Sequence, residues 1–361
     1  MDLYQKISIL GPSAKYDTCG PQDFGDTTNI PGVYHAKVGG NHVCRLFKVL
    51  QTNKCLNNCR YCAFRRDRAC PRVSATSDQM ALAFDSAHRR RLVDGLFLSS
   101  GITNSADTTM THMLDTLDIV RHKYKYKGYV HLKIMPGASD AVIRQSFKLA
   151  NRISINIESP TQTDLTHLSP DKNLKNGFFD TLFRIRKAVN QAKYYKLKTP
   201  SLTTQFVVGA GQEKDSDIIH TTHLLYQQFG LKRVFYSPFR PIPQTPLADK
   251  PATPITRAHR LYQADFLMRF YRFSPQDLYV DSSGRLDFNI DPKMLWAQKN
   301  PHFYPINLNK ADYWKLLKIP GIGPTSAKKI IRQRQHSRLF SFSQLSGLRL
   351  QISKISQFSC F

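Results

Sequence analysis

The sequence predicts an α/β protein, with a sheet of six parallel strands, open or curled into a partial barrel, followed by a small helical domain. Three observations lead to this prediction. Apolar, β-branched runs alternate with helix-like segments along 43–236. Prolines then become dense over 238–254, which indicates a connecting segment with little regular structure. Near the C-terminus, helix-like stretches flank the turn Pro320-Gly321-Ile322-Gly323. Strands that alternate with helices indicate parallel pairing and right-handed crossovers.

The expected elements can be placed along the chain. Helices are expected at 110–124, 140–150, 178–198 and 215–229, with a mixed helical stretch at 256–272. The six strands are expected at 43–50, 95–101, 129–135, 152–158, 203–208 and 233–236. In parallel sheets of this kind, the chemistry lies at the carboxyl ends of the strands. The segments at these ends are the cysteine loop 55–62, Ser99-Ser100-Gly101, Glu158 and Gly209-Ala210-Gly211.

We expect four parts in the 361 residues. They are an N-terminal lead segment over 1–40, the sheet domain over 41–240, a Pro-rich connecting and mixed segment over 241–304, and a C-terminal domain over 305–361. The sequence carries no internal repeat and no signal for a particular oligomeric state.

The charge balance indicates a polyanionic partner. The chain has 52 Lys and Arg residues against 26 Asp and Glu residues, a formal net charge of +26. Nucleic acid is the commonest partner for such a field. A general basic bias that only aids solubility is the alternative.

The expected location is a reducing cytoplasm. The chain has no long uncharged apolar stretch, so we expect no membrane span. Its first residues lack the basic, apolar and small-residue succession of a signal peptide. Seven cysteines in a chain of this length, three of them clustered, do not suggest a disulfide framework.

The three clustered cysteines are the most informative feature of the chain. Cys55, Cys59 and Cys62 stand at i, i+4 and i+7 directly after the strand expected at 43–50. Thiolates this close, on a loop leaving a strand, can converge on one metal centre. Three of them leave one coordination position unfilled, and an iron–sulfur cluster with an open iron can do chemistry.

This cysteine spacing, with Tyr61 before the third cysteine, resembles the signature of the radical S-adenosylmethionine enzymes. The Gly-rich segments at 99–102 and 209–213 match loops of that superfamily. The segments 95–101, 131–138 and 156–158 are similar to one subgroup, described as putative DNA modification or repair proteins. Members of that subgroup join a partial (β/α)6 TIM-like barrel to a helix-hairpin-helix tail.

The resemblance implies the cofactors and their ligands. Cys55, Cys59 and Cys62 would hold three irons of a [4Fe-4S] cluster, and the fourth iron would bind S-adenosyl-L-methionine. Reductive cleavage would then give a 5′-deoxyadenosyl radical. A flavodoxin or ferredoxin would be the electron donor. The implied cofactor-binding residues are Tyr61; Ser99, Ser100 and Gly101 at the methionine end; Asn156 and Glu158 at the ribose or ammonium group; and Val208 and Gly209 at adenine.

Other interpretations of these residues stay open. A zinc site would need a fourth ligand, which Cys70 or His42 could supply. Cys19, Cys44, Cys70 and Cys360 are either buried or incidental thiols or ligands of an auxiliary cluster. Glu158 and Lys133 could form a pair inside the barrel. Arg65, Arg66, Arg68 and Arg72 either guide a phosphate to the barrel or form a solvated face.

The C-terminal block resembles a helix-hairpin-helix unit. Asn309 is expected to cap its first helix, and Thr325 or Ser326 to open the second. The glycines Gly321 and Gly323, with Ile322 between them, would let backbone N–H groups face a phosphate. Lys328 and Lys329 add charge, and 305–361 contains ten Lys or Arg residues and one acidic residue, Asp312. A structural or protein-binding hairpin is the alternative, and a more degenerate hairpin is expected over 342–358.

Together, these features predict a radical S-adenosylmethionine enzyme that acts on DNA to modify or repair a nucleotide. Phosphate contacts deliver the enzyme to nucleic acid without choosing the base. Two alternatives remain, the modification of structured RNA and a non-catalytic iron–sulfur protein that binds DNA or senses redox state.

Overall fold

The computed structural model describes residues 1–16, 30–37, 43–348 and 350–361. Two segments of the chain, Met1–Glu213 and Leu224–Pro254, form one compact unit. The segments Lys214–His223 and Ile255–Phe361 form a second compact unit. No helix in these described ranges is both long enough and apolar enough to cross a membrane.

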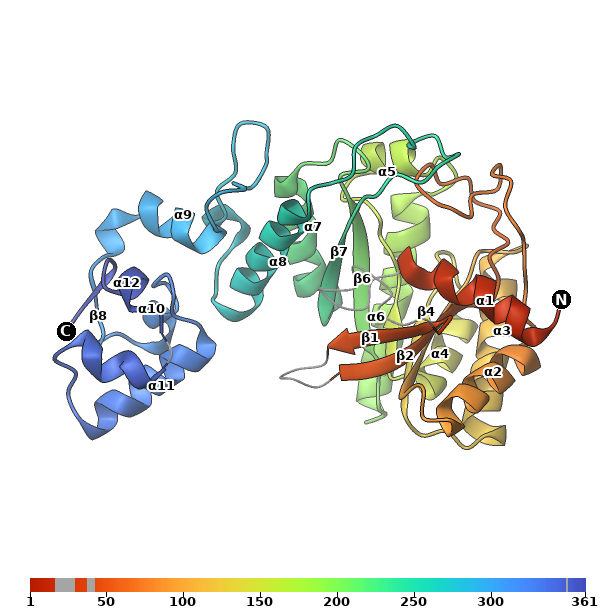
Figure 1. Cartoon of the computed structure of the whole chain (residues 1–361), viewed down its shortest axis with the longest axis horizontal. Helices are drawn as coiled ribbons and strands as arrows, with labels where there is room; N and C mark the ends of the chain where they lie inside the picture. Colours follow the sequence, from red (N-terminus) through yellow and green to blue (C-terminus); the bar gives the residue numbers. More distant parts are fainter. Residues whose placement is uncertain (17–29, 38–42, 349) are drawn as a thin grey trace. The chain divides into compact units, whose positions relative to one another are not determined.

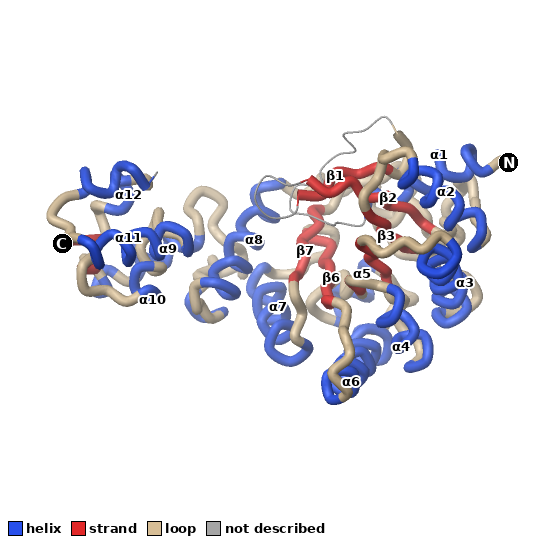
Figure 2. Tube along the Cα trace, turned by 90° about the horizontal axis from the view of Figure 1, so that it is seen from below, coloured by secondary structure: helices blue, strands red, loops and turns tan. Residues whose placement is uncertain are grey.

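The first unit is built on a seven-stranded sheet whose strands follow chain order (Figure 1). All neighbouring strands from β2 to β7 pair in parallel, and β1 pairs antiparallel with β2. The sheet curls into an open partial barrel with helices on its outer side (Figure 2), which confirms the predicted fold class. The strands are β1 (Val33–Lys37), β2 (Val43–Leu50), β3 (Gly95–Ser99), β4 (Tyr129–Lys133), β5 (Arg152–Ser154), β6 (Ser201–Val208) and β7 (Arg233–Pro238).

Helices connect the parallel strands β2 to β7 of this sheet, and α1 precedes β1. Their polar N-caps set where they begin: the side chain of Thr76 accepts the N–H of Gln79 before α2, and Ser105 accepts the N–H of Thr108 before α3. The helices are α1 (Leu3–Ser13), α2 (Ser77–Arg89), α3 (Ala106–Asp118), α4 (Asp140–Leu149), α5 (Gln162–Leu168), α6 (Asp180–Tyr194) and α7 (Asp215–Phe229).

The side-chain alternation of the strands divides the core into two layers. In β3, Leu96 and Leu98 face the helices, whereas Phe97 and Ser99 face the inside of the barrel, and all four side chains are buried. A strand covered on both faces reads as a continuous apolar run, which is why the sequence revealed β3. Polar residues of this inner face lie at the carboxyl ends, as Ser99 does, and also in the middle of strands, where the His131 ring of β4 packs against Phe97 with ring centroids 4.5 Å apart.

Several elements differ from the sequence-based expectation. The antiparallel strand β1 and the helix α1 lie in the segment expected only as a lead. The strand expected at 152–158 is regular only as far as Ser154, with an isolated bridge between Glu158 and Phe206. The helices expected at 110–124 and 178–198 each include a π-helical turn, at Ile119–Lys123 and Leu174–Phe179.

The second unit is mainly helical around its own apolar core. It contains α8 (Ile255–Phe270), α9 (Pro292–Lys299), α10 (Tyr313–Leu316), α11 (Pro324–His336) and α12 (Ile352–Ile355). It is not purely helical as expected, because β8 (Ile306–Asn307) pairs with β9 (Ser359–Cys360). A 3₁₀-helix (Phe342–Leu348) and α12 occupy the stretch where a second hairpin was expected. The core includes Leu308, Leu316, Leu317, Ile319, Ile322, Ala327 and Ile330.

One cap in this unit was misassigned. Asp312, rather than Asn309, caps α10, and its side chain accepts the N–H of Lys315 at 2.8 Å. The Asn309 side chain instead bonds the backbone of Leu339 through both its oxygen and its nitrogen. Asn309 therefore ties the hairpin to the segment that follows α11.

Candidate functional site

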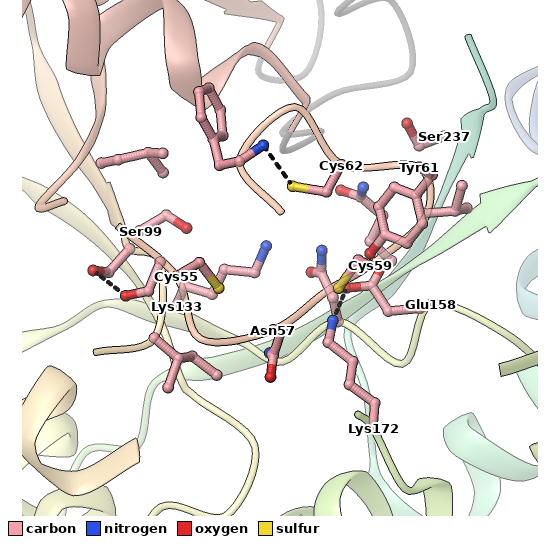
Figure 3. A pocket seen from close by; sticks show the side chains of 18 of the residues that line it. Cys55, Asn57, Cys59, Tyr61, Cys62, Ser99, Lys133, Glu158, Lys172 and Ser237 are labelled. Carbon is pink, nitrogen blue, oxygen red and sulfur yellow. Dashed lines mark hydrogen bonds and ion pairs between the residues drawn. The ribbon is translucent and has the colours of Figure 1, made fainter. Parts of the chain in front are cut away.

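A cavity of about 190 Å³ lies at the carboxyl ends of the parallel strands. The three clustered cysteines, which follow β2, line it together with residues at the ends of the five other parallel strands, β3 to β7 (Figure 3). Nine of the site residues predicted from the sequence line this cavity: Cys55, Cys59, Tyr61, Cys62, Ser99, Ser100, Gly101, Asn156 and Glu158. Residues distant in sequence thus meet at the edge of the sheet where chemistry is expected.

Backbone hydrogen bonds hold the cysteine loop against the loop that follows β3. The N–H of Gly101 donates to the carbonyl of Thr52, and the N–H of Leu56 donates to the carbonyl of Ile102, both at 2.8 Å. A Cβ added at Gly101 would lie 2.1 Å from the carbonyl oxygen of Lys54. Gly101 is therefore required for the close approach of the two loops, a reason that the sequence did not reveal.

Arg72 organises the segment after the third cysteine. Its guanidinium donates to the backbone carbonyls of Asn53, Phe64 and Arg68, each at 2.9 Å, and to that of Arg65. The Nη hydrogens of Arg72, a residue considered from the sequence as a phosphate guide or part of a solvated face, are therefore engaged by backbone carbonyls. Its role is to fold the loop that carries the thiols.

Of the three thiols of the cavity, that of Cys59 is buried, and those of Cys55 and Cys62 are partly exposed. Cys59 is 6% exposed, and its Sγ lies 3.1 Å from the Ser169 hydroxyl. The N–H of Phe64 donates to the Cys62 Sγ at 3.4 Å. Burial, followed by the neighbouring Cys59, raises the pKa of Cys62 to about 12. The free Cys62 thiol is therefore protonated, and it needs a cation to become a thiolate.

The arrangement of the thiols suits a cluster better than a single ion. Figure 3 shows the sulfur atoms of Cys55, Cys59 and Cys62 around one shared space. Within the described ranges, no three His, Cys, Asp or Glu side chains are gathered closely enough to hold one metal ion. A cubane cluster binds each cysteine at a different iron and so tolerates wider spacing than tetrahedral zinc does.

The other cysteines that the structure describes do not line this cavity. Cys70 and Cys44 belong to the same unit but do not line the cavity, and Cys360 lies in the second unit. Cys19 and His42 lie outside the described residues. Cys70 therefore does not act here as the fourth ligand that a zinc site would need.

A buried ion pair closes one side of the cavity. The ammonium of Lys172, which is 14% exposed, lies 3.2 Å from Glu158 Oε1. Burial lowers the pKa of Lys172, but Cys59 and Glu158 outweigh burial, so that the pKa lies above its usual range. Burial and then Glu158 also raise the pKa of the Tyr61 hydroxyl well above its usual range. Glu158 has a φ of +66°, in the left-handed region that residues other than glycine seldom adopt.

Lys172 is the site residue that sequence reasoning missed. The sequence left open a pair between Glu158 and Lys133, whereas the structure pairs Glu158 with Lys172. Lys133 also lines the cavity, and Figure 3 shows its side chain extending into the space between the three sulfur atoms. Lys172 follows α5 in an irregular segment, where no motif or periodicity marks it.

Two predicted site residues do not line the cavity. Val208 and Gly209 are absent from its wall, and Val207 faces it instead. The Val208 carbonyl accepts hydrogen bonds from the Phe239 N–H and the Thr253 hydroxyl. The Gly209 N–H donates to Glu213. These backbone groups are therefore already engaged within the chain.

The second unit presents the hairpin residues predicted from the sequence. Gly321 adopts a φ of +88°, which favours glycine, and Gly323 is the N-cap of α11. Ile322 is buried, whereas Thr325, Lys328 and Lys329 are exposed. Because Pro324 opens the helix, the first-turn amides at Thr325 and Ser326 have no intrahelical carbonyl to bond. This end of the helix can accept an anion.

A family model supports the hairpin, because residues 302–349 match the model of the helix-hairpin-helix motif. The comparison with curated protein sequences found no match to the chain.

Among solved structures, the chain is similar to the FeFe-hydrogenase maturase HydG from Carboxydothermus hydrogenoformans, with 18% identity and a TM-score of 0.47. The match covers 61% of this chain and 50% of the maturase. A radical SAM methyltransferase from Sphaerobacter thermophilus has 13% identity and a TM-score of 0.47, covering 64% of this chain and 65% of the methyltransferase. Methylornithine synthase (PylB) has 12% identity and a TM-score of 0.46, covering 61% and 60%.

Proposed function

We propose that this chain is a radical S-adenosylmethionine enzyme that acts on nucleic acid, with DNA as the substrate. The observation that carries the proposal is that Cys55, Cys59 and Cys62 line one cavity at the carboxyl ends of the parallel strands. Among the described residues, that cavity has three thiols and no fourth cysteine, the donor set of a [4Fe-4S] cluster with one open iron.

The residues of the cavity fit this pair of cofactors. The cluster and S-adenosylmethionine, when bound, supply one-electron reductive cleavage of the sulfonium. The hydroxyls of Ser99 and Ser100 are suited to bind the ammonium and carboxylate groups of S-adenosylmethionine. Asn156 and Glu158 are suited to its ribose hydroxyls, and the buried Lys172 ammonium adds positive charge beside Cys59. An electron from a flavodoxin or ferredoxin is required.

Two features support nucleic acid as the substrate. The second unit carries the helix-hairpin-helix match, and its exposed Lys328 and Lys329 follow the free amides of α11. The net charge of +26 favours polyanions in general. We assign the activity to modification or repair of a DNA nucleotide, and comparison of DNA with structured RNA in binding and turnover assays tests this choice.

The assignment of the thiols is tested by replacing single cysteines. Cys59→Ala should lose the bound cluster and abolish 5′-deoxyadenosine formation after anaerobic reconstitution, because one iron loses its ligand. Cys70→Ala is the matched control, since Cys70 comes from the same region but does not line the cavity. Iron content, the visible absorbance of the cluster and 5′-deoxyadenosine are measured. Unchanged cleavage by Cys59→Ala would refute the assignment.

A further inference from the structure

A buried lysine lies directly behind the turn of the hairpin. Lys293 belongs to the first turn of α9, and its side chain is mostly buried, with the residue 9% exposed. Its Nζ donates to the carbonyl oxygen of Ile322 at 2.6 Å. Lys293 lies outside residues 302–349, the part that matches the helix-hairpin-helix model. The family model therefore does not account for this contact.

The position of Lys293 is costly for the fold. Within the described ranges, no carboxylate lies at ion-pair distance from its ammonium, whose neighbours are the Ile322 carbonyl and the ring of Tyr271 at 4.8 Å. Burial lowers the pKa of Lys293 to about 7. An apolar residue of similar size would avoid this desolvation cost. Stability alone therefore does not explain a lysine here.

The contact has a geometric consequence for the hairpin. In a trans peptide unit, the C=O and the N–H point in opposite directions. Because Lys293 holds the Ile322 carbonyl toward the interior, the N–H of the next residue, Gly323, points away from it. That N–H precedes the unbonded first-turn amides of Thr325 and Ser326. Lys293 thus sets the direction of the first donor in this group.

We propose that Lys293 is the internal cation of a phosphodiester-binding surface on the hairpin. Its ammonium anchors the Ile322 carbonyl so that the Gly323 amide faces the phosphate, and its charge adds to the attraction for that phosphate. Lys293 is a positioning residue, because the hairpin backbone lies between it and the ligand. The inference rests on the proposed binding of nucleic acid.

The surroundings of Lys293 give the binding a pH dependence. The charged groups that act on its ammonium are Asp291, which raises its pKa, and Lys318, which lowers it. The Tyr271 ring lies 4.8 Å from the Lys293 Nζ. Burial lowers the pKa of Lys318, and Asp277 acts against this effect. A bound phosphate raises the Lys293 pKa, so that binding takes up a proton. Affinity is then highest below about pH 7 and falls as the pH rises through this value.

The test uses the full chain and a fluorescent DNA duplex at fixed ionic strength. The wild type should bind about tenfold more tightly at about pH 6 than at about pH 8.5, the effect of a pKa displacement of about one unit. Lys293→Met should lose this difference and bind weakly at both values. Lys299→Met is the matched control, because it removes one exposed lysine from the same helix. It should keep the wild-type pH dependence.

Lys293→Arg provides a second variant that keeps the charge at both pH values. It should bind with little pH dependence, whereas any pH dependence that arises from other groups would remain in every variant. A Lys293→Met or Lys293→Arg variant with the full wild-type pH dependence would overturn the role of Lys293. A wild type that binds neither DNA nor RNA at either pH would instead overturn the proposed binding of nucleic acid.

Discussion

The backbone around the three thiols leaves no room for a side chain at Gly101. The carbonyl of Lys54, next to Cys55, occupies the position that a Cβ would take. Arg72 complements this contact from the other side of the loop by donating to four backbone carbonyls. The geometry of the cysteine loop thus depends on Gly101 and Arg72 as well as on the three cysteines.

Gly101→Ala should therefore destabilise the first unit by about 3 kcal/mol, because one of two backbone segments must move. It should also reduce the iron retained after reconstitution. Gly177→Ala is the matched control, since its nearest contact would be an ordinary 3.8 Å to Pro136. Thermal unfolding midpoints and iron content are measured. Equal midpoints for the two variants would show that the loops tolerate the added methyl group.

Individual residues also show which parts of the candidate site could be predicted from the sequence. The thiols were recognisable because their spacing is local, and all three line the cavity. The pair between Lys172 and Glu158 was not recognisable, because it depends on the path of the chain through α5 and the segment after it. The importance of Arg72 was hidden for a similar reason, since its partners are backbone carbonyls that carry no sequence signal.

At the scale of elements, the parallel strands were the most predictable feature. Strands such as β3 are buried on both faces and read as apolar runs, and α7 (Asp215–Phe229) has the bounds expected from its pattern. The edge strand β1 was missed, because His35 and Lys37 interrupt its short apolar pattern. The π-helical turns were missed as well, because periodicity does not distinguish them from α-helix.

The N-terminus of α11 offers a substitution that separates folding from phosphate binding. Gly323→Asp places a carboxylate at the N-cap, which favours the helix but repels a phosphate. Gly323→Asn caps the helix without the charge. We expect the aspartate variant to bind a DNA duplex about tenfold more weakly than the asparagine variant at low salt. Equal binding, with equal helix content by circular dichroism, would exclude the hairpin from the interface.

At the scale of the whole molecule, the chain carries two different candidate sites, one in each of its compact units. One unit holds the thiol-lined cavity, and the other holds the hairpin with its surplus of Lys and Arg. The net charge of +26 favours the approach of a polyanion. In the proposed function, the base that would react and the hydrogen atom that would be abstracted have no readable motif in the sequence, because they would depend on the fit of the substrate in the cavity.

The most direct test of this account is turnover by the reconstituted wild-type protein. The protein is incubated anaerobically with S-adenosylmethionine, a low-potential reductant and duplex DNA, and the products are analysed by mass spectrometry. The account predicts 5′-deoxyadenosine together with a nucleoside of altered mass in the digested DNA. Protein that retains its iron–sulfur cluster but forms no 5′-deoxyadenosine would contradict the account and favour a non-catalytic iron–sulfur protein.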